Sequence, residues 1–197
     1  KKERRFILIG RIAVSLTIIF LVILLASIIF RGISGFYTTN ISLKTTLSEE
    51  IIDPDQSKNI DEIFKASWRK VSRTAIYSIL DEYNDSKNIE KSTRKEKRDF
   101  IRLFSRSSEF YVRDYALKNI NDIGEVVTIN VPSSSLVDQY LKGKIDINTD
   151  ESNRPISDAQ ILWVNFMLEK KMIEKKFNVS FFSNGDSRNS EEAGILG

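Results

Sequence analysis

The chain has 197 residues, of which 41% are hydrophobic and 29% charged, a composition typical of a folded protein and not of a disordered one. It contains neither cysteine nor histidine, which excludes a disulfide scaffold and cysteine catalysis and removes the most common general base and metal ligand. Residues 1–11 carry a charge of +4 and the whole chain +3, so the remainder carries −1, and the basic excess does not indicate a nucleic-acid partner.

The first predicted element is a membrane span. Residues 12–30 are free of charged residues and proline, and no face of this stretch is polar. As a helix, nineteen residues at about 1.5 Å each reach roughly 28 Å, close to the ~30 Å hydrocarbon thickness of a bilayer. With its flanks, we place the transmembrane helix at residues 6–31.

The flanking charges predict the orientation of this span. Residues 1–5 form a basic stub, which the positive-inside rule places in the cytoplasm, so that residues 32–190 form an extracytoplasmic domain. Arg11 lies near the helix end, where we expect its side chain to reach the headgroups and not to serve a function within the membrane. The competing interpretation is a cleaved signal peptide, but the apolar run is long and residues 30–33 are a poor cleavage site, so an uncleaved anchor is favoured.

The next 90 residues predict one strand followed by helices. The chain leaves the membrane through residues 32–40. Apolar and polar residues then alternate over 41–47, which is the pattern of a half-buried strand, and residues 53–55 mark a turn. Apolar spacings of three and four predict a helix over 60–83 with Trp68 near its core stripe, then a loop over 84–93. The basic run at 91–98 leads into an amphipathic helix that includes residues 100–104, and we interpret it as a solvated face.

The remaining elements alternate between helices and strands. Ser107 or Ser108 can cap a helix that reaches Leu117, and a β-branched strand over 126–131 is closed by Pro132. A short helix is predicted over 133–141 that stops at Gly143, followed by a polar loop over 149–155. A capping box at 157–160 opens a helix over 161–168. The last prediction is a strand over 177–182 that ends at the Asn184-Gly185 turn. The predicted fold class is therefore membrane-anchored α+β, helix-rich, with three or four strands.

No catalytic, cofactor-binding or metal-binding residue is predicted, and substrate-binding residues cannot be named. Four acidic residues could be considered as a cation site: Asp53, Asp55, Asp61 and Glu62. They lack the spacing and the turn glycine of an EF-hand. We interpret them as carboxylates that are favoured near the N-terminus of a helix. Residues 184–188 could hold an anion on backbone amides and Arg188, but a structural turn is favoured.

Residues 191–197 change from acidic to small and apolar, and we expect them to be the start of a second span. Together with the first span, several segments resemble the N-terminal region of PstA-type permeases, the membrane subunits of bacterial phosphate ABC importers: residues 34–36, 52–55, 141–146, 181–188 and 192–197. The most specific segment is the phenylalanine-rich block that ends in Asp-Ser-Arg, with the Ala-Gly-Ile that follows it. One branch of these permeases carries a large domain of no assigned activity between its first two spans.

The resemblance implies a non-catalytic subunit of a transporter in the bacterial inner (plasma) membrane. It implies as partners a second permease of the PstC type, ATPase subunits and a periplasmic phosphate-binding protein. The apolar span adds membrane lipid as a partner, and we expect no cofactor and no nucleic acid. We expect the extracytoplasmic domain to be a docking or bracing module. The alternative is a single-pass membrane-anchored sensor or small-anion-binding domain, suggested by Arg188, Arg154 and the basic cluster near Lys95. A carboxylate-only hydrolase anchored to the membrane is the least favoured.

Overall fold

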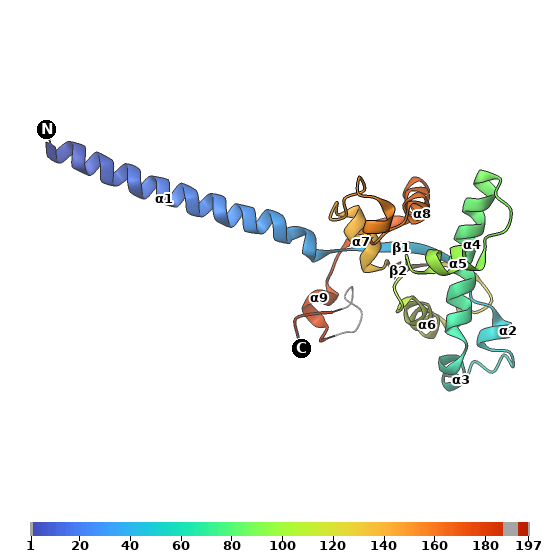
Figure 1. The fold of residues 1–197 in the computed structure, drawn as a ribbon. Coiled ribbons are helices and arrows are strands. Elements are labelled where there is room, and N and C mark those ends of the chain that lie inside the picture. Colours follow the sequence, from blue (N-terminus) through green and yellow to red (C-terminus); the bar gives the residue numbers. More distant parts are fainter. Residues whose placement is uncertain (1, 187–192, 197) are drawn as a thin grey trace. The chain divides into compact units, whose positions relative to one another are not determined.

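The computed structural model describes residues 2–186 and 193–196, and the chain divides into two units, Lys1–Tyr37 and Thr38–Gly197. Figure 1 shows the elements along the chain. In order they are α1 (Lys2–Gly32), η1 (Ile33–Phe36), β1 (Tyr37–Thr46), α2 (Glu49–Ile52), α3 (Ile60–Lys65), α4 (Trp68–Lys87), α5 (Arg94–Ile101), α6 (Ser108–Lys118), η2 (Ile120–Asp122), β2 (Val126–Pro132), α7 (Ser135–Leu141), η3 (Glu151–Asn153), α8 (Asp158–Glu169), β3 (Ile173–Phe177) and α9 (Ser180–Ser183).

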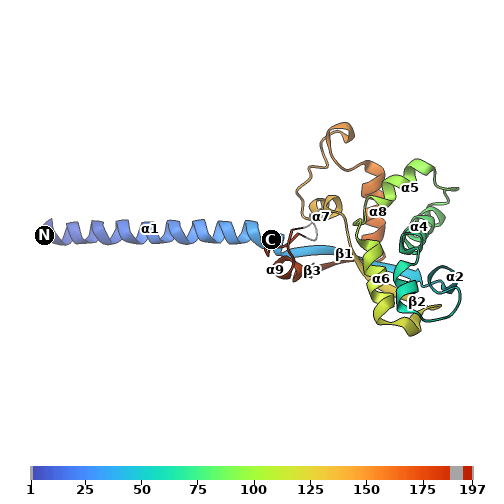
Figure 2. The same cartoon turned by 90° about the horizontal axis from the view of Figure 1, so that it is seen from below.

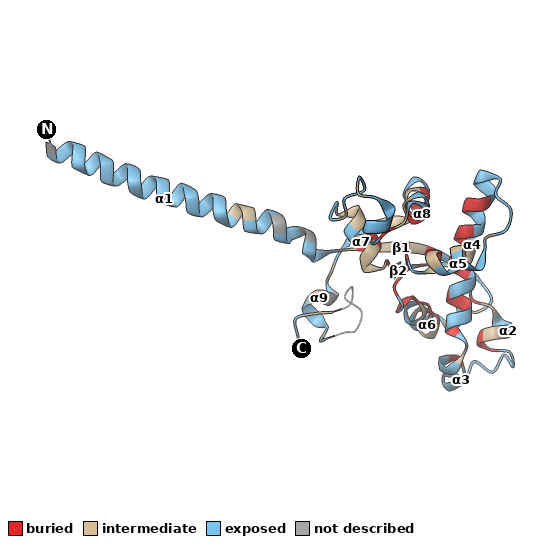
Figure 3. Cartoon of the chain, in the orientation of Figure 1, coloured by how far each residue is buried: buried red, intermediate tan, exposed pale blue. Residues whose placement is uncertain are grey.

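Helix α1 is long and apolar enough to cross a membrane over Glu3–Phe30. Its large apolar side chains are exposed along the whole length, from Phe6 to Phe30 (Figure 3). Length and composition suit a membrane anchor or a signal sequence equally. The predicted limits of the span, residues 6–31, fall inside this single unbroken helix.

The second unit contains a three-stranded sheet in the order β2-β1-β3. Strands β1 and β2 are antiparallel, and their register places Ile41 opposite Val131 and Leu43 opposite Ile129. All four of these side chains are buried, whereas Lys44 and Thr46 of β1 are exposed. The predicted alternation over 41–47 and the predicted strand over 126–131 are therefore confirmed: one face of this pair is buried and the other is not.

The hydrophobic core lies between this face of the sheet and the helices. Helix α4 contacts α5, α6 and α8, and α6 also contacts β2. Buried aromatic rings of this core meet edge to face, with centroids 5.4 Å apart for both Phe100–Trp163 and Tyr83–Phe166. In Figure 3 the buried residues follow the facing sides of α4, α6 and α8. The second unit is thus α+β and helix-rich, as predicted.

The predicted helix over residues 60–83 is two helices, α3 and α4, with a break at Ala66 and Ser67. The Trp68 indole N–H donates to the carbonyl of Ile63 at 3.0 Å, which satisfies an end carbonyl of α3. Ile60 and Phe64 of the expected core stripe are exposed, and the Phe64 ring lies 4.6 Å from the Arg113 guanidinium carbon. The prediction was wrong because an apolar spacing that fits one helix also fits two helices with different orientations.

The predicted loop over 84–93 also begins too early, because α4 continues to Lys87. Asn88 ends it in the left-handed conformation, with φ of 52°, which asparagine tolerates. Residues 84–87 therefore form the last turn of the helix, in which Asn84 is buried and residues 85–87 are exposed.

The predicted strand over 177–182 is wrong. Strand β3 is Ile173–Phe177, four residues earlier, and Ser180–Ser183 is the short helix α9. The Asn178 side chain accepts a hydrogen bond from the backbone N–H of Phe181 at 3.1 Å, and this bond favours a helical turn where alternation suggested a strand. Asn184 and Gly185, predicted as a turn after a strand, instead follow a helix and are in no assigned turn.

Two capping boxes fix helix starts. The predicted one, Ser157 with Gln160, is confirmed at α8, and an unpredicted one, Thr93 with Glu96, opens α5. Hydrogen bonds from the Thr93 backbone N–H and hydroxyl lower the pKa of Glu96. By contrast, Ser107 and Ser134 precede α6 and α7 without a side-chain cap bond. Gly143, with φ of 66°, follows α7 as the predicted stop.

Candidate functional site

The acidic residues considered as a cation site do not form one. Asp53 is buried, and its carboxylate accepts hydrogen bonds from the backbone N–H groups of Ser57 and Lys58 at 3.0 and 2.9 Å. Glu62 accepts a bond from the Ser57 hydroxyl at 2.9 Å. Within residues 2–186 and 193–196, no group of three acidic side chains could hold a metal ion. Asp53 and Glu62 thus hold the loop between α2 and α3 through Ser57 and Lys58, while Asp61 and Glu62 lie in the first turn of α3.

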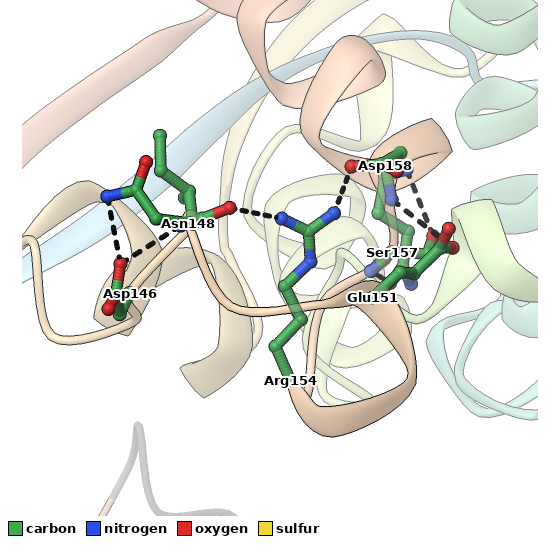
Figure 4. A network of polar contacts seen from close by, with 8 residues as sticks. Asp146, Asn148, Glu151, Arg154, Ser157 and Asp158 are labelled. Atoms are coloured by element: carbon green, nitrogen blue, oxygen red, sulfur yellow. Dashed lines mark hydrogen bonds and ion pairs between the residues drawn. The ribbon is translucent and has the colours of Figure 1, made fainter.

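Arg154, considered for anion binding, is part of a folded polar network (Figure 4). Its guanidinium donates to the carbonyl of Ile147 at 2.8 Å and forms an ion pair with Asp158. Its side chain is only 6% exposed, and Asp146 and Glu151 lie in the same network. The surrounding carboxylates would repel an anion, so Arg154 fastens the loop before α8 to the helix start.

Replacing Arg154 with methionine is expected to lower the free energy of unfolding of the second unit by about 1–3 kcal/mol. The substitution keeps much of the side-chain length but leaves the Ile147 carbonyl without this donor and Asp158 without its partner. Denaturant unfolding, followed by fluorescence of the chain's two tryptophans, measures the change. The exposed Arg94 provides the control, since Arg94→Met should change stability by no more than about 0.5 kcal/mol; equal effects would show that the network adds nothing.

The remaining residues considered for anion binding are Arg188 and the basic cluster near Lys95. Arg188 lies outside the described residues. Lys95 is exposed on α5, in a stretch that also contains Glu90 and Glu96. The basic run at 91–98 is the solvated start of an amphipathic helix, as predicted.

A different group of basic residues lines an open cleft of about 860 Å³ in the second unit. Two arginines, Arg69 and Arg73, lie on successive turns of α4. Two more, Arg102 and Arg106, come from the segment between α5 and α6. Ser134 and Ser135, at the start of α7, also line it. We call this feature the arginine cleft.

The segment that carries Arg106 is held by buried hydrogen bonds. Ser105 donates its backbone N–H to the carbonyl of Pro132 at 3.0 Å, which ties the segment to the end of β2. The hydroxyls of Ser105 and Ser107 lie 2.8 Å apart, and the Ser108 hydroxyl donates to the Ser105 carbonyl at 2.7 Å. All three serines are buried. The backbone on this side of the cleft is therefore fixed, while the arginine side chains extend into solvent.

The charge of the arginine cleft is strongly positive. Glu109 is the single acidic residue in its lining, and Arg102 pairs with Asp99 at 3.5 Å across an exposed surface. Arg69, Arg73 and Arg106 are exposed, and within the described part of the chain their side chains form no ion pair or hydrogen bond. Free guanidinium groups that share a cleft attract anions and can bind them through paired N–H donors.

A second cleft, of about 840 Å³, has a different character. It lies at the end of α4 and the start of α5, and its lining combines acidic Asp81, Asp85 and Glu90 with basic Lys91 and Lys97. Charges of both signs leave no net attraction for an anion. The excess of one sign therefore distinguishes the arginine cleft.

Sequence reasoning did not find the arginine cleft, although a signal is present. Arg69 and Arg73 are four residues apart, as are Arg102 and Arg106, and the serine-rich segments at 105–108 and 133–135 are also visible. Spacing of four places each α4 arginine beside the other on one helix face. The packing of α4 against α5 and α6, which joins the two pairs, is not visible in the sequence.

Comparison with known proteins gives one family. The sequence model of a family described as Domain of unknown function (DUF3333) matches residues 1–151, which is 151 of the 197 residues. The chain belongs to the DUF3333 family. No curated protein and no solved structure matches it. The DUF3333 match extends from α1 through β2 and α7 and includes every residue that lines the arginine cleft, whereas α8, β3 and α9 lie beyond it.

Proposed function

We propose that this DUF3333 chain is the N-terminal part of a PstA-type permease, the membrane subunit of an ABC importer for inorganic phosphate. The observation that carries the proposal is the order of parts: basic residues, an exposed apolar helix of membrane-spanning length, and an α+β unit that follows within a few residues. This order agrees with the segments that resemble such permeases. In this role α1 is an uncleaved anchor with its N-terminus in the cytoplasm of a bacterial cell.

The α+β unit then faces the periplasm and serves as a docking or bracing module. Its partners are the second permease of the PstC type or the phosphate-binding protein, while ATP hydrolysis belongs to separate ATPase subunits. The carboxylates described above and Arg154 are used in structural hydrogen bonds, and this supports a non-catalytic role. The free arginines favour contact with a negatively charged partner or ligand.

Topology tests the anchor. Alkaline phosphatase fused after Glu90, in the exposed loop between α4 and α5, is expected to be active, whereas a fluorescent protein fused there should stay dark. A fluorescent protein fused before Phe6 is the control and should be bright. The chain should also stay in carbonate-washed membranes at its full mass. A cytosolic reporter at Glu90, or loss of the first 30 or so residues, would contradict the anchor.

The transport role needs a separate experiment in the cell. Deletion of residues 40–185 is expected to reduce recovery of the importer complex or binding of the phosphate-binding protein, and with it phosphate uptake. Unchanged uptake and recovery would contradict the docking role. The alternative is a single-pass sensor or small-anion-binding domain, and the reading frame after Gly197 distinguishes it from a permease. Five further spans would indicate a permease, whereas an immediate stop codon would indicate a single-pass protein.

A further inference from the structure

We infer that the arginine cleft binds a small molecule that carries two or more phosphoryl groups, such as an oligophosphate or a phosphate ester with several charges. This inference goes beyond the proposed transport role and does not depend on it, because binding is measured without transport. It rests on three features of the cleft: the number and freedom of its arginines, its size, and the rigid backbone behind it.

The first feature is a set of arginine side chains whose guanidinium N–H groups are available to donate hydrogen bonds to a ligand. Arg69, Arg73 and Arg106 have no ion pair or hydrogen bond from their side chains within residues 2–186 and 193–196. Each guanidinium can donate two parallel N–H bonds to one anion. These arginines come from two separate chain segments, α4 and the turn before α6. A planar carboxylate has two oxygens and suits one such fork, whereas tetrahedral phosphoryl groups offer oxygens in several directions.

The second feature is size. A volume of about 860 Å³ lies within the range of roughly 300–1,000 Å³ that holds organic ligands. One orthophosphate would leave most of this space empty. The lining also includes the apolar side chains of Ile76, Ile101 and Phe104, which can contact the organic part of a phosphate ester. Both observations favour a ligand larger than orthophosphate.

The third feature is the fixed polar backbone behind the arginines. Ser72, Ser105 and Ser108 are each at most 5% exposed and line the cleft. The Ser134 hydroxyl, also in the lining, is buried and has no hydrogen-bond partner among the described residues. An unpartnered buried hydroxyl costs free energy, and a rotation of the Ser134 side chain toward the cleft would let a bound oxyanion accept from it. The arrangement is thus prepared for an acceptor-rich ligand.

Calorimetry of the full chain tests this site. The chain is purified in a non-ionic maltoside detergent and titrated with tripolyphosphate, pyrophosphate and orthophosphate in buffer of low ionic strength, where exposed charges are screened least. Saturable binding of one tripolyphosphate per chain is expected, with orthophosphate at least tenfold weaker. No saturable heat with millimolar tripolyphosphate would overturn the inference.

A matched pair of double variants locates the site. Arg69→Gln with Arg73→Gln should weaken tripolyphosphate binding at least tenfold. Arg94→Gln with Arg98→Gln removes the same charge from two exposed arginines four residues apart on α5, outside the cleft, and should change binding less than twofold. Equal losses in the two double variants would show diffuse attraction and overturn the site. Unchanged tryptophan emission of both variants confirms that they fold.

Competition experiments identify the class and source of the ligand. Vesicles of phosphatidylcholine with 20% phosphatidic acid that displace tripolyphosphate, where pure phosphatidylcholine vesicles do not, would support the phosphoryl site and point to a lipid headgroup as its source. Failure of both vesicles to compete would support a soluble ligand. A deca-glutamate peptide that competes as well as tripolyphosphate would overturn the phosphoryl class in favour of an acidic protein surface.

Discussion

Replacing Phe100 with alanine is expected to lower the free energy of unfolding of the α+β unit by about 3–5 kcal/mol. Phe100 is 1% exposed, and its ring packs between Trp163 and Phe104, with centroid distances of 5.4 and 5.7 Å. It joins α5 to α8 at the centre of the core. Alanine leaves a cavity that the surrounding helices cannot close, so both the lost burial and the lost ring contacts destabilise the fold.

Denaturant unfolding measured by far-ultraviolet circular dichroism checks this result without depending on tryptophan emission, which the substitution itself would change. Phe110, about half exposed on α6, is the matched control, and Phe110→Ala should cost about 1 kcal/mol or less. A loss below about 1 kcal/mol for Phe100→Ala would show that α5 and α8 do not share a packed core.

Asp53→Ala is expected to destabilise the same unit by about 2–4 kcal/mol, the second-largest effect. The Asp53 carboxylate accepts from the backbone N–H groups of Ser57 and Lys58 and from the Ser57 hydroxyl, and it is 4% exposed. Alanine removes all of these acceptors at once. Gln56 and Lys58 have φ of 52°, a conformation that costs free energy in residues other than glycine and that these hydrogen bonds support.

Two comparisons separate this structural role from metal binding. Asp55, exposed in the same turn, is the control, and Asp55→Ala should change the unfolding free energy by no more than about 0.5 kcal/mol. The unfolding midpoint of the unaltered chain should also be the same with calcium or with a chelator. A calcium-dependent midpoint that both substitutions abolish would restore the cation site that the hydrogen bonds argue against.

Much of the fold follows from local patterns in the sequence. The alternation at 41–47 places Ile41 and Leu43 on the buried face because a strand has a period of two. The capping box at Ser157 was visible because its two hydrogen bonds require a fixed spacing. The apolar helix near the N-terminus needs no tertiary information at all.

The errors arise where local signals compete or where distant segments meet. Periodicity alone could not show the break at Ala66 and Ser67, which depends on the Trp68 side chain reaching the Ile63 carbonyl. Similarly, Phe177 and Val179 alternate as in a strand, but Asn178 bonds its own downstream backbone and starts a helix. The arginine cleft was missed for a different reason, since tertiary packing assembles it from α4, the segment before α6, and the start of α7.

The path of the chain after α1 has a mechanical consequence. No loop intervenes between η1 and β1, and β1 is the middle strand of the sheet. It is paired with β2 in a register of seven residue pairs and adjoins β3 on its other side (Figure 2). A force applied through the N-terminal helix would therefore act on the central strand, which is hydrogen-bonded on both sides, and not on an edge strand. Pulling from that end in a single-molecule experiment should unfold the whole unit in one abrupt step, because the strand that receives the force is also the central strand of the sheet.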